Sequence, residues 1–155
     1  MNAVEYVLAG GLAVGGPDRP AIVTPDECLT YGDLAARVGR FSAALREAGI
    51  KPGDRVAMLM LDHADLVALY LAVIASGGVA VTVSTRASAH DLAHVFGIVR
   101  PFAVITEEEF AETVTANVPS HAKLMLRQRE LAAWKRRPET GFAPCARKPM
   151  TRRIG

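Results

Sequence analysis

Cysteine and aromatic residues are scarce in this sequence. Its 155 residues contain two cysteines, Cys28 and Cys145, which are too few and too far apart for a disulfide framework or a zinc site. We interpret both as incidental and expect a reducing, cytoplasmic setting. Aromatic residues make up only 6% of the chain, whereas 50% of it is hydrophobic, so the expected core is aliphatic. This hydrophobic content also excludes a chain that is disordered throughout.

The sequence also lacks a secretory signal and an uninterrupted membrane span. Residues 1–16 contain an acidic residue, Glu5, and several glycines, but no basic segment. Residues 66–85 form a stretch of 20 residues without charge, which is long enough to cross a bilayer. A serine and two glycines at 76–78 interrupt this stretch, and the part that follows is rich in β-branched residues. A buried helix followed by a buried strand explains it better than a membrane span.

Charge is divided unevenly along the chain. Residues 1–119 contain 8 Lys or Arg and 14 Asp or Glu, a net charge of −6, whereas residues 120–155 contain 10 and 2, a net charge of +8. We therefore distinguish an N-terminal segment (1–19), an α/β part (20–119) and a basic, Pro- and Arg-rich tail (120–155) that we expect to be poorly ordered. The tail has the charge to neutralise phosphates, but no recognition fold is visible in it. A solvated linker or an out-of-frame translation accounts for it better than a nucleic-acid partner.

Local patterns near the start of the α/β part predict a hairpin and a helix. Strand-like runs at 21–24 and 28–30 flank a Pro-Asp turn, which favours a β-hairpin. Thr30, with Asp33 three residues later, predicts a capping box at the start of an amphipathic helix. Gly49 is expected to end this helix.

Apolar runs and helical patterns then alternate along the chain. The expected elements are a strand at 55–61, a helix at 63–75 capped by Asp62, a strand at 79–83, a helix between Ser88 and Pro101, a strand at 102–105, and three weaker elements, a helix at 107–117, a strand at 123–126 and a helix at 129–135. The helix at 63–75 is apolar around its whole circumference, so we expect it to be covered on more than one side.

Strands without polar alternation that are linked by helices indicate a parallel sheet covered on both faces. The predicted fold class is therefore α/β. We expect a partial doubly wound, three-layer domain with a small, mainly parallel sheet, an N-terminal β-hairpin and a loop-rich basic C-terminal tail.

Several segments resemble a known enzyme family. Three of them look like the N-terminal part of the adenylate-forming enzymes, which include the AMP-forming acyl-CoA synthetases: LTYGDL (29–34), GIKPGDRVA (49–57) and LYLAVIASGGVAV (69–81). Shorter matches are similar to benzoate–CoA ligases in particular: MLD (60–62), ST (84–85) and SAHDL (88–92). The resemblance covers about Pro20 to Glu109, and its strength lies in the joint order and spacing of the segments.

The resemblance implies a ligase that uses ATP to convert a small carboxylic acid into an acyl-adenylate and then into a coenzyme A thioester. ATP, Mg²⁺ and coenzyme A serve the intact family, whose matched region is largely scaffold. The family's phosphate loop with its lysine, its AMP-binding motif, its ribose-binding aspartate and its C-terminal catalytic lysine are absent from these residues. The resemblance therefore predicts an N-terminal fragment that is inactive alone, with no catalytic residue, no metal site and no bound cofactor. A truncated or frameshifted gene would produce this picture.

An alternative hypothesis is a non-catalytic α/β interaction module or a subunit that depends on a partner. Such a module would dock through an exposed sheet edge and the apolar helix at 66–74, either to a second copy or to a complementing chain.

One group of residues is a candidate substrate or anion site. Ser84, Thr85, Arg86 and Ser88 follow a predicted parallel strand and open a helix. Ligands bind at the carboxyl ends of such strands, and helix N-termini attract anions. Helix capping by Ser88 and a solvated arginine account for the same pattern without a ligand.

Two further groups have the residue types of a metal site. His90 and His94 have the spacing of paired metal ligands on a helix, but no third ligand is placed, which favours surface histidines. Glu107, Glu108 and Glu109 form an acidic cluster, for which favourable charges in the first turn of a helix are the better interpretation.

Overall fold

The computed structural model describes residues 3–138 of the chain. Its elements are, in order, α1 (Ala3–Gly15), β1 (Pro20–Val23), β2 (Cys28–Thr30), α2 (Tyr31–Glu47), β3 (Arg55–Leu59), α3 (Ala64–Ala75), β4 (Val79–Thr82), α4 (Ala89–Val99), β5 (Ala103–Thr106), the 3-10 helix η1 (Glu108–Phe110), α5 (Ala111–Asn117), β6 (Leu124–Arg127) and α6 (Gln128–Lys135). Cys145 and the part of the predicted basic tail beyond residue 138 lie outside the described residues.

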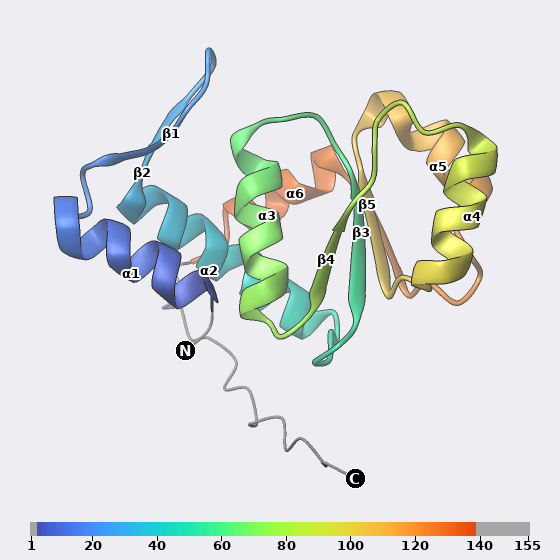
Figure 1. Ribbon diagram of the computed structural model, residues 1–155, viewed down its shortest axis with the longest axis horizontal. Coiled ribbons are helices and arrows are strands. Elements are labelled where there is room, and N and C mark those ends of the chain that lie inside the picture. Colours follow the sequence, from blue (N-terminus) through green and yellow to red (C-terminus); the bar gives the residue numbers. More distant parts are fainter. Residues whose placement is uncertain (1–2, 139–155) are drawn as a thin grey trace, which may run out of the picture.

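The centre of the fold is a four-stranded parallel sheet with the strand order β4-β3-β5-β6. β1 and β2 form a separate antiparallel hairpin, as predicted. β4 lies on one side of β3, whereas β5 and β6 lie on the other side. The order in which successive strands are added to the sheet therefore reverses next to β3 (Figure 1). The predicted α/β fold with a small parallel sheet is therefore confirmed, and the point of reversal lies between β3 and β5.

Helices cover both faces of the sheet and form two cores. The larger core joins α1, α2, α3 and α6 to one face of β3, where Val56 and Met58 are buried. The smaller core joins α4 and α5 to the opposite face, where Ala57 and Leu59 are buried. Successive residues of a strand point to opposite faces, which explains how β3 contributes to both cores. In Figure 1 the sheet accordingly stands between α3 and α4.

Capping residues set the starts of α2 and α4. Thr30 and Asp33 form the predicted capping box of α2, and Ser88 forms the same arrangement with Asp91 at α4. The start of α3 differs from the prediction. Asp62 does not cap this helix; the N-cap residue is His63, whose side chain makes no capping hydrogen bond.

Helix α3 is covered less completely than its apolar sequence suggests. Leu69 and Val73 are fully buried, whereas Val67 and Tyr70 keep exposed fractions of 41% and 40%. Most of the helix that we considered as a docking surface, at 66–74, therefore belongs to the core of the chain itself. Within residues 3–138, no helix combines the length and the apolar character that crossing a bilayer requires.

Helix α1 was not predicted. It packs on α2 and α3, and a Cβ atom at Gly11 would overlap the ring of Tyr31 at the start of α2. The two central glycines weaken the helical pattern in the sequence. At Gly11, however, the missing side chain is what allows the close contact between the two helices.

The sheet continues past residue 120, where the charge of the chain changes sign. β6 pairs in parallel with β5, and α6 returns over the larger core. Trp134 of α6 meets Phe41 of α2 edge to face, with ring centroids 6.2 Å apart. The predicted strand at 123–126 and helix at 129–135 are thus confirmed.

Candidate functional site

The carboxyl ends of the four parallel strands meet at one edge of the sheet, which we call the carboxyl edge. The loops that follow β3 and β4 lie there, together with Glu107 after β5. In doubly wound sheets ligands bind at this edge, next to the point where the strand order reverses. The carboxyl edge is therefore where a functional site is expected.

Glu107 occupies the reversal point between β3 and β5. Its exposed fraction is only 5%. Oε1 of Glu107 accepts a hydrogen bond from the backbone N–H of Leu61 over 2.6 Å, and it lies 2.8 Å from Nε2 of His63. The end of β5 is thereby tied to the loop after β3. Glu107 is the N-cap residue of η1 and Glu108 and Glu109 lie in its first turn, as the helix interpretation predicted, and Glu107 is in addition a buried carboxylate that fixes the loop after β3.

One hollow of about 310 Å³ lies between the ends of β3 and β4. Its lining combines apolar side chains with hydroxyl groups and one carboxylate: Met58, Met60, Asp62, Leu66, Thr82, Val83, Ser84 and Thr85. Met60 and Asp62 alternate along the loop with the two residues that Glu107 holds. The contact with Glu107 therefore fixes the loop that forms part of the wall of this hollow.

A second hollow of about 380 Å³ adjoins the first beside α4. Ser84 and Arg86 line it, as does Asp91. Ser88 is committed to capping, because its hydroxyl donates to Asp91 Oδ2 over 2.7 Å and accepts from the backbone N–H of Asp91. Hydrogen bonds from the side chain and the backbone of Ser88 lower the pKa of Asp91.

The structure thus places three of the four predicted site residues together. Ser84, Thr85 and Arg86 line the hollows at the end of β4, and Ser88 supports the following helix. The carboxylates of Asp62 and Asp91 were not part of the predicted site. Asp91 lines the same hollow as Arg86 and offsets its positive charge. This limits how much negative charge a ligand in that hollow can carry.

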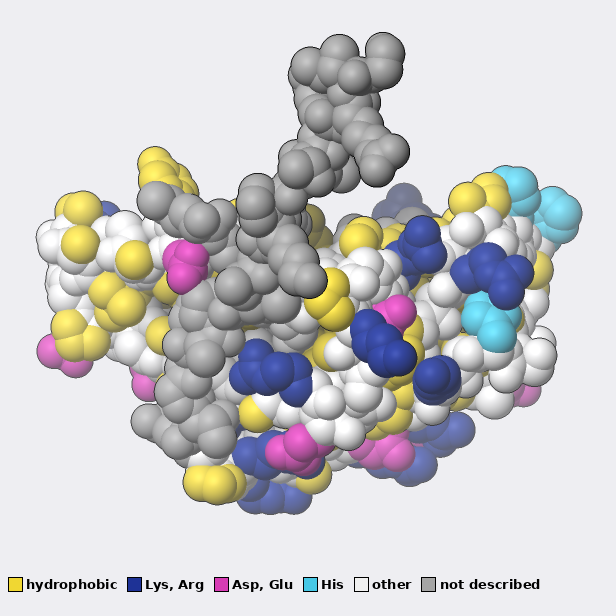
Figure 2. All heavy atoms as spheres, turned by 90° about the horizontal axis from the view of Figure 1, so that it is seen from below, with side chains coloured by type: hydrophobic (Ala, Val, Ile, Leu, Met, Phe, Trp, Pro, Cys, Tyr) yellow, Lys and Arg dark blue, Asp and Glu magenta, His cyan; other side chains and the backbone are white. Residues whose placement is uncertain are grey.

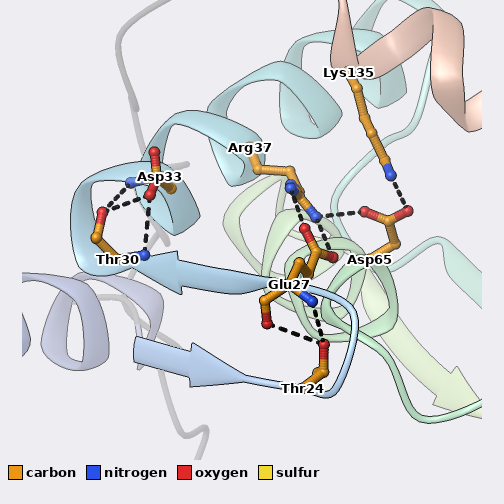
Figure 3. Close-up of polar contacts among 7 residues, drawn as sticks. All are labelled: Thr24, Glu27, Thr30, Asp33, Arg37, Asp65 and Lys135. Carbon is orange, nitrogen blue, oxygen red and sulfur yellow. Dashed lines mark hydrogen bonds and ion pairs between the residues drawn. The ribbon is translucent and has the colours of Figure 1, made fainter. Parts of the chain in front are cut away.

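A second polar cluster joins the hairpin to α2, α3 and α6 (Figure 3). Arg37 of α2 contacts Glu27 over 2.9 Å and Asp65 over 2.8 Å, and Lys135 also pairs with Asp65. Asp65 is buried, with an exposed fraction of 4%. Its two cations supply the pairing that a buried carboxylate requires.

The pKa values in this cluster follow from these contacts. The hydrogen bond from Arg37 lowers the pKa of Glu27, against the opposing effect of burial. Burial by itself lowers the pKa of Arg37, but the contacts with Glu27 and Asp65 outweigh it and raise this pKa. The sequence-based predictions did not include this cluster. A usable signal was present, because Asp65 is the one charged residue of an otherwise apolar helix.

The remaining candidates do not form a site. His90 and His94 are both exposed on α4, as is Cys28 on the hairpin. Among residues 3–138, no group of three His, Cys, Asp or Glu side chains is arranged to hold a metal ion.

Comparison with protein families identifies the chain. The model of the family described as "AMP-binding enzyme" matches residues 13–149. This match covers most of the sequence. The chain belongs to the AMP-binding enzyme family. The resemblance to adenylate-forming enzymes that the sequence motifs indicated is thereby confirmed.

Two curated relatives act on hydroxybenzoates. The 3-hydroxybenzoate–CoA ligase of Aromatoleum sp. (strain CIB) is 36% identical over 111 residues, which cover 72% of this chain and 21% of the ligase. The 3-hydroxybenzoate–CoA/4-hydroxybenzoate–CoA ligase of Thauera aromatica is 37% identical over 95 residues, which cover 61% of this chain and 18% of the ligase. The chain thus spans about a fifth of the length of these relatives.

Solved structures share the fold. A benzoate CoA ligase from Burkholderia xenovorans LB400 superposes with a TM-score of 0.84 at 24% identity, over 96% of this chain and 31% of that protein. The N-terminal domain of FACL13 from Mycobacterium tuberculosis superposes with a TM-score of 0.84 at 25% identity, over 94% of this chain and 38% of that domain's chain.

Proposed function

We propose that this chain is scaffold from the N-terminal part of an ATP-dependent acid–CoA ligase that acts on an aromatic carboxylic acid in the cytoplasm. In the intact enzyme, the acid and ATP would form an acyl-adenylate, and coenzyme A would then take up the acyl group. The observation that carries the proposal is the family match over residues 13–149. The identity of 36% to a 3-hydroxybenzoate–CoA ligase supports the choice of an aromatic acid.

We further propose that these 155 residues do not catalyse adenylation alone. Charge that develops on phosphates is stabilised by converging amides, cations and usually Mg²⁺. The sequence contains no Thr/Ser/Gly-rich loop followed by a lysine. Of the two hollows at the carboxyl edge, one is lined by a single cation, Arg86, and the other by none, which is little positive charge for a triphosphate. No step of the reaction is therefore assigned to the residues of this chain.

A smaller role is proposed for the end of β4. Ser84, Thr85 and Arg86 would contact a single anionic group of a substrate or cofactor, with Arg86 supplying the positive charge. Ser88 would act indirectly, by fixing the start of α4. The shared location of these side chains at the carboxyl edge supports this role.

A chimera tests the proposal. The matching 111 residues of the Aromatoleum ligase are replaced by those of this chain, and 3-hydroxybenzoate-dependent ATP–pyrophosphate exchange is measured. We expect exchange by the chimera and none by the 155-residue chain alone. In a matched chimera, Leu69→Asp introduces a carboxylate at a fully buried position and should abolish exchange together with folding.

Two results would contradict these proposals. Exchange by the 155-residue chain alone would refute its inactivity. A chimera that has the circular dichroism and melting behaviour of a folded protein but no exchange activity would refute the scaffold role. Within the active chimera, Arg86→Ala should raise the KM of one substrate or cofactor and leave folding unchanged, and an unaltered KM for all of them would remove the proposed anion contact.

A further inference from the structure

The segment that joins β3 to α3 presents alternate residues to two different surroundings. Three of its residues line the hollow of about 310 Å³ at the end of β4: Met60, Asp62 and Leu66. The residues between them are held by other parts of the fold. The N–H of Leu61 and the ring of His63 contact Glu107, and Asp65 forms ion pairs with side chains of α2 and α6. Residues 60–66, which we call the wall segment, are therefore fixed relative to the sheet.

Arg86 follows the end of β4 and has no ion pair, although two carboxylates lie near it. Asp91 lines the same hollow as Arg86, and Asp62 lines the adjoining one. The two hollows share three lining residues, so they meet at the end of β4: Thr82, Val83 and Ser84. Within the part of the chain that the structure describes, neither carboxylate pairs with the guanidinium.

Pairing is the arrangement that such charges ordinarily adopt when they can reach one another, since a guanidinium matches the geometry of a carboxylate. Exposed pairs do occur in this chain, such as Arg127 with Glu108. Figure 2 shows Lys and Arg side chains beside Asp and Glu side chains on another face of the molecule. Near Arg86, by contrast, the carboxylate of Asp91 is held by Ser88, whose hydroxyl and backbone N–H donate to Oδ2 over 2.7 Å and 2.9 Å.

Asp62 is held indirectly. Its own side chain forms no hydrogen bond or ion pair with residues 3–138, whereas both of its neighbours in the chain contact Glu107. We propose that Glu107 is a positioning residue for Arg86: by holding the wall segment, it keeps Asp62 from pairing with the guanidinium, which stays available to an anionic group of the substrate or cofactor. This inference rests on the anion contact of Arg86 proposed above.

Loss of the Glu107 contact would turn Asp62 into an internal competitor for Arg86. The wall segment would lose its tie to the end of β5, and the carboxylate of Asp62 could then approach the guanidinium. The resulting ion pair would be exposed to water, and such pairs are weak. We therefore expect the affinity of Arg86 for an external anion to fall by about two- to fivefold.

The experiment uses the 155-residue chain and benzoate, a rigid probe with one carboxylate. An NMR titration followed at the Nε–H signal of Arg86 should give a dissociation constant on the order of millimolar for the parent chain. Glu107→Ala should raise it about two- to fivefold, and Glu107→Gln, which keeps one acceptor, should raise it less. Adding Asp62→Asn to either variant should restore the parent value, which a purely structural role of Glu107 would not allow. Thermal melts identify the folded variants, and Glu107→Gln carries the test if Glu107→Ala does not fold.

A measurement without ligand tests the same point. Asp62→Asn should shift the Nε–H signal of Arg86 in the Glu107 variants and leave it nearly unchanged in the parent chain. The matched control is Glu109→Ala, at an exposed position two residues after Glu107. It should bind benzoate like the parent chain.

The inference would be overturned by folded Glu107 variants that bind benzoate like the parent chain. A raised dissociation constant that Asp62→Asn does not restore would overturn it as well, because Glu107 would then act only through the stability of the fold. Benzoate binding that is absent, or that Arg86→Ala leaves unchanged, would instead refute the proposed anion contact. The signal shifts without ligand would then still decide whether Glu107 keeps Asp62 from Arg86.

Discussion

Two kinds of helix start occur side by side in this protein. Helices α2 and α4 begin with capping boxes whose members stand three residues apart, Thr30 with Asp33 and Ser88 with Asp91. Helix α3 begins at His63 without a side-chain cap. The loop before it is held by Glu107, which comes from the other side of the reversal point, 44 residues later in the chain.

The difference separates local from tertiary control of a helix start. A capping box satisfies backbone N–H groups with neighbouring side chains, so it can stabilise the helix before the sheet has formed. Glu107 can act only when β3 and β5 are paired, and burial then makes its hydrogen bonds difficult to replace. The loop at the carboxyl edge therefore depends on the completed fold, whereas α2 and α4 carry their own signals.

The largest expected effect follows from removing the tertiary contact. Glu107→Ala removes a buried carboxylate that accepts a hydrogen bond from the partly buried N–H of Leu61 and contacts the ring of His63. We expect a loss of about 2–4 kcal/mol in the free energy of unfolding, measured by urea titration. Glu107→Gln keeps one acceptor and should recover part of the loss.

The control for this experiment is Glu109→Ala, two residues later at an exposed position. It should change the free energy of unfolding by less than about 0.5 kcal/mol. Equal losses for the two alanine variants would mean that the contact of Glu107 with the β3 loop does not stabilise the fold.

A smaller effect is expected at the polar cluster around Asp65 of α3. Its ion pairs also join residues that are far apart in the sequence. Arg37 and Asp65 have side-chain exposed fractions of 15% and 6%, so water screens their ion pair weakly. A double-mutant cycle on this pair should give a coupling energy of about 1.5–3 kcal/mol. The matched exposed pair, Arg127 with Glu108, should give at most about 1 kcal/mol. Coupling of similar size in both pairs would show that burial is not what distinguishes them.

The same division explains how much of the fold could be predicted from the sequence. The hairpin, α2, α4 and the strands of the parallel sheet carry local signals and were found. The strand at 79–83 was wrongly predicted to be buried, because β4 lies at the edge of the sheet and Val79 is exposed. Helix α1 was missed because the reason for Gly11, its contact with Tyr31, lies in another element.

Prediction of the candidate site met the same limit. That Ser84 follows a parallel strand was evident, and this placed it at the carboxyl edge. Its neighbour Asp62 and the buried Glu107 depend on the strand order, which no local pattern encodes. Asp62 was even assigned a capping role, since a carboxylate before a helix ordinarily has one.

The smallest expected effect belongs to the local caps and depends on pH. Thr30→Ala should lower the free energy of unfolding by about 1 kcal/mol at pH 7. Hydrogen bonds from the side chain and the backbone of Thr30 lower the pKa of Asp33 in the folded protein. A depressed pKa contributes stability that is present above the unfolded value of about 3.9 and is lost as the pH falls through the folded value. The free energy of unfolding should therefore differ between Thr30→Ala and the parent chain by a constant amount from pH 7 to about pH 5. This difference should become smaller below about pH 4. Urea titrations along this series measure it, and a difference that stays constant into acid would mean that Asp33 is not part of the cap's free energy.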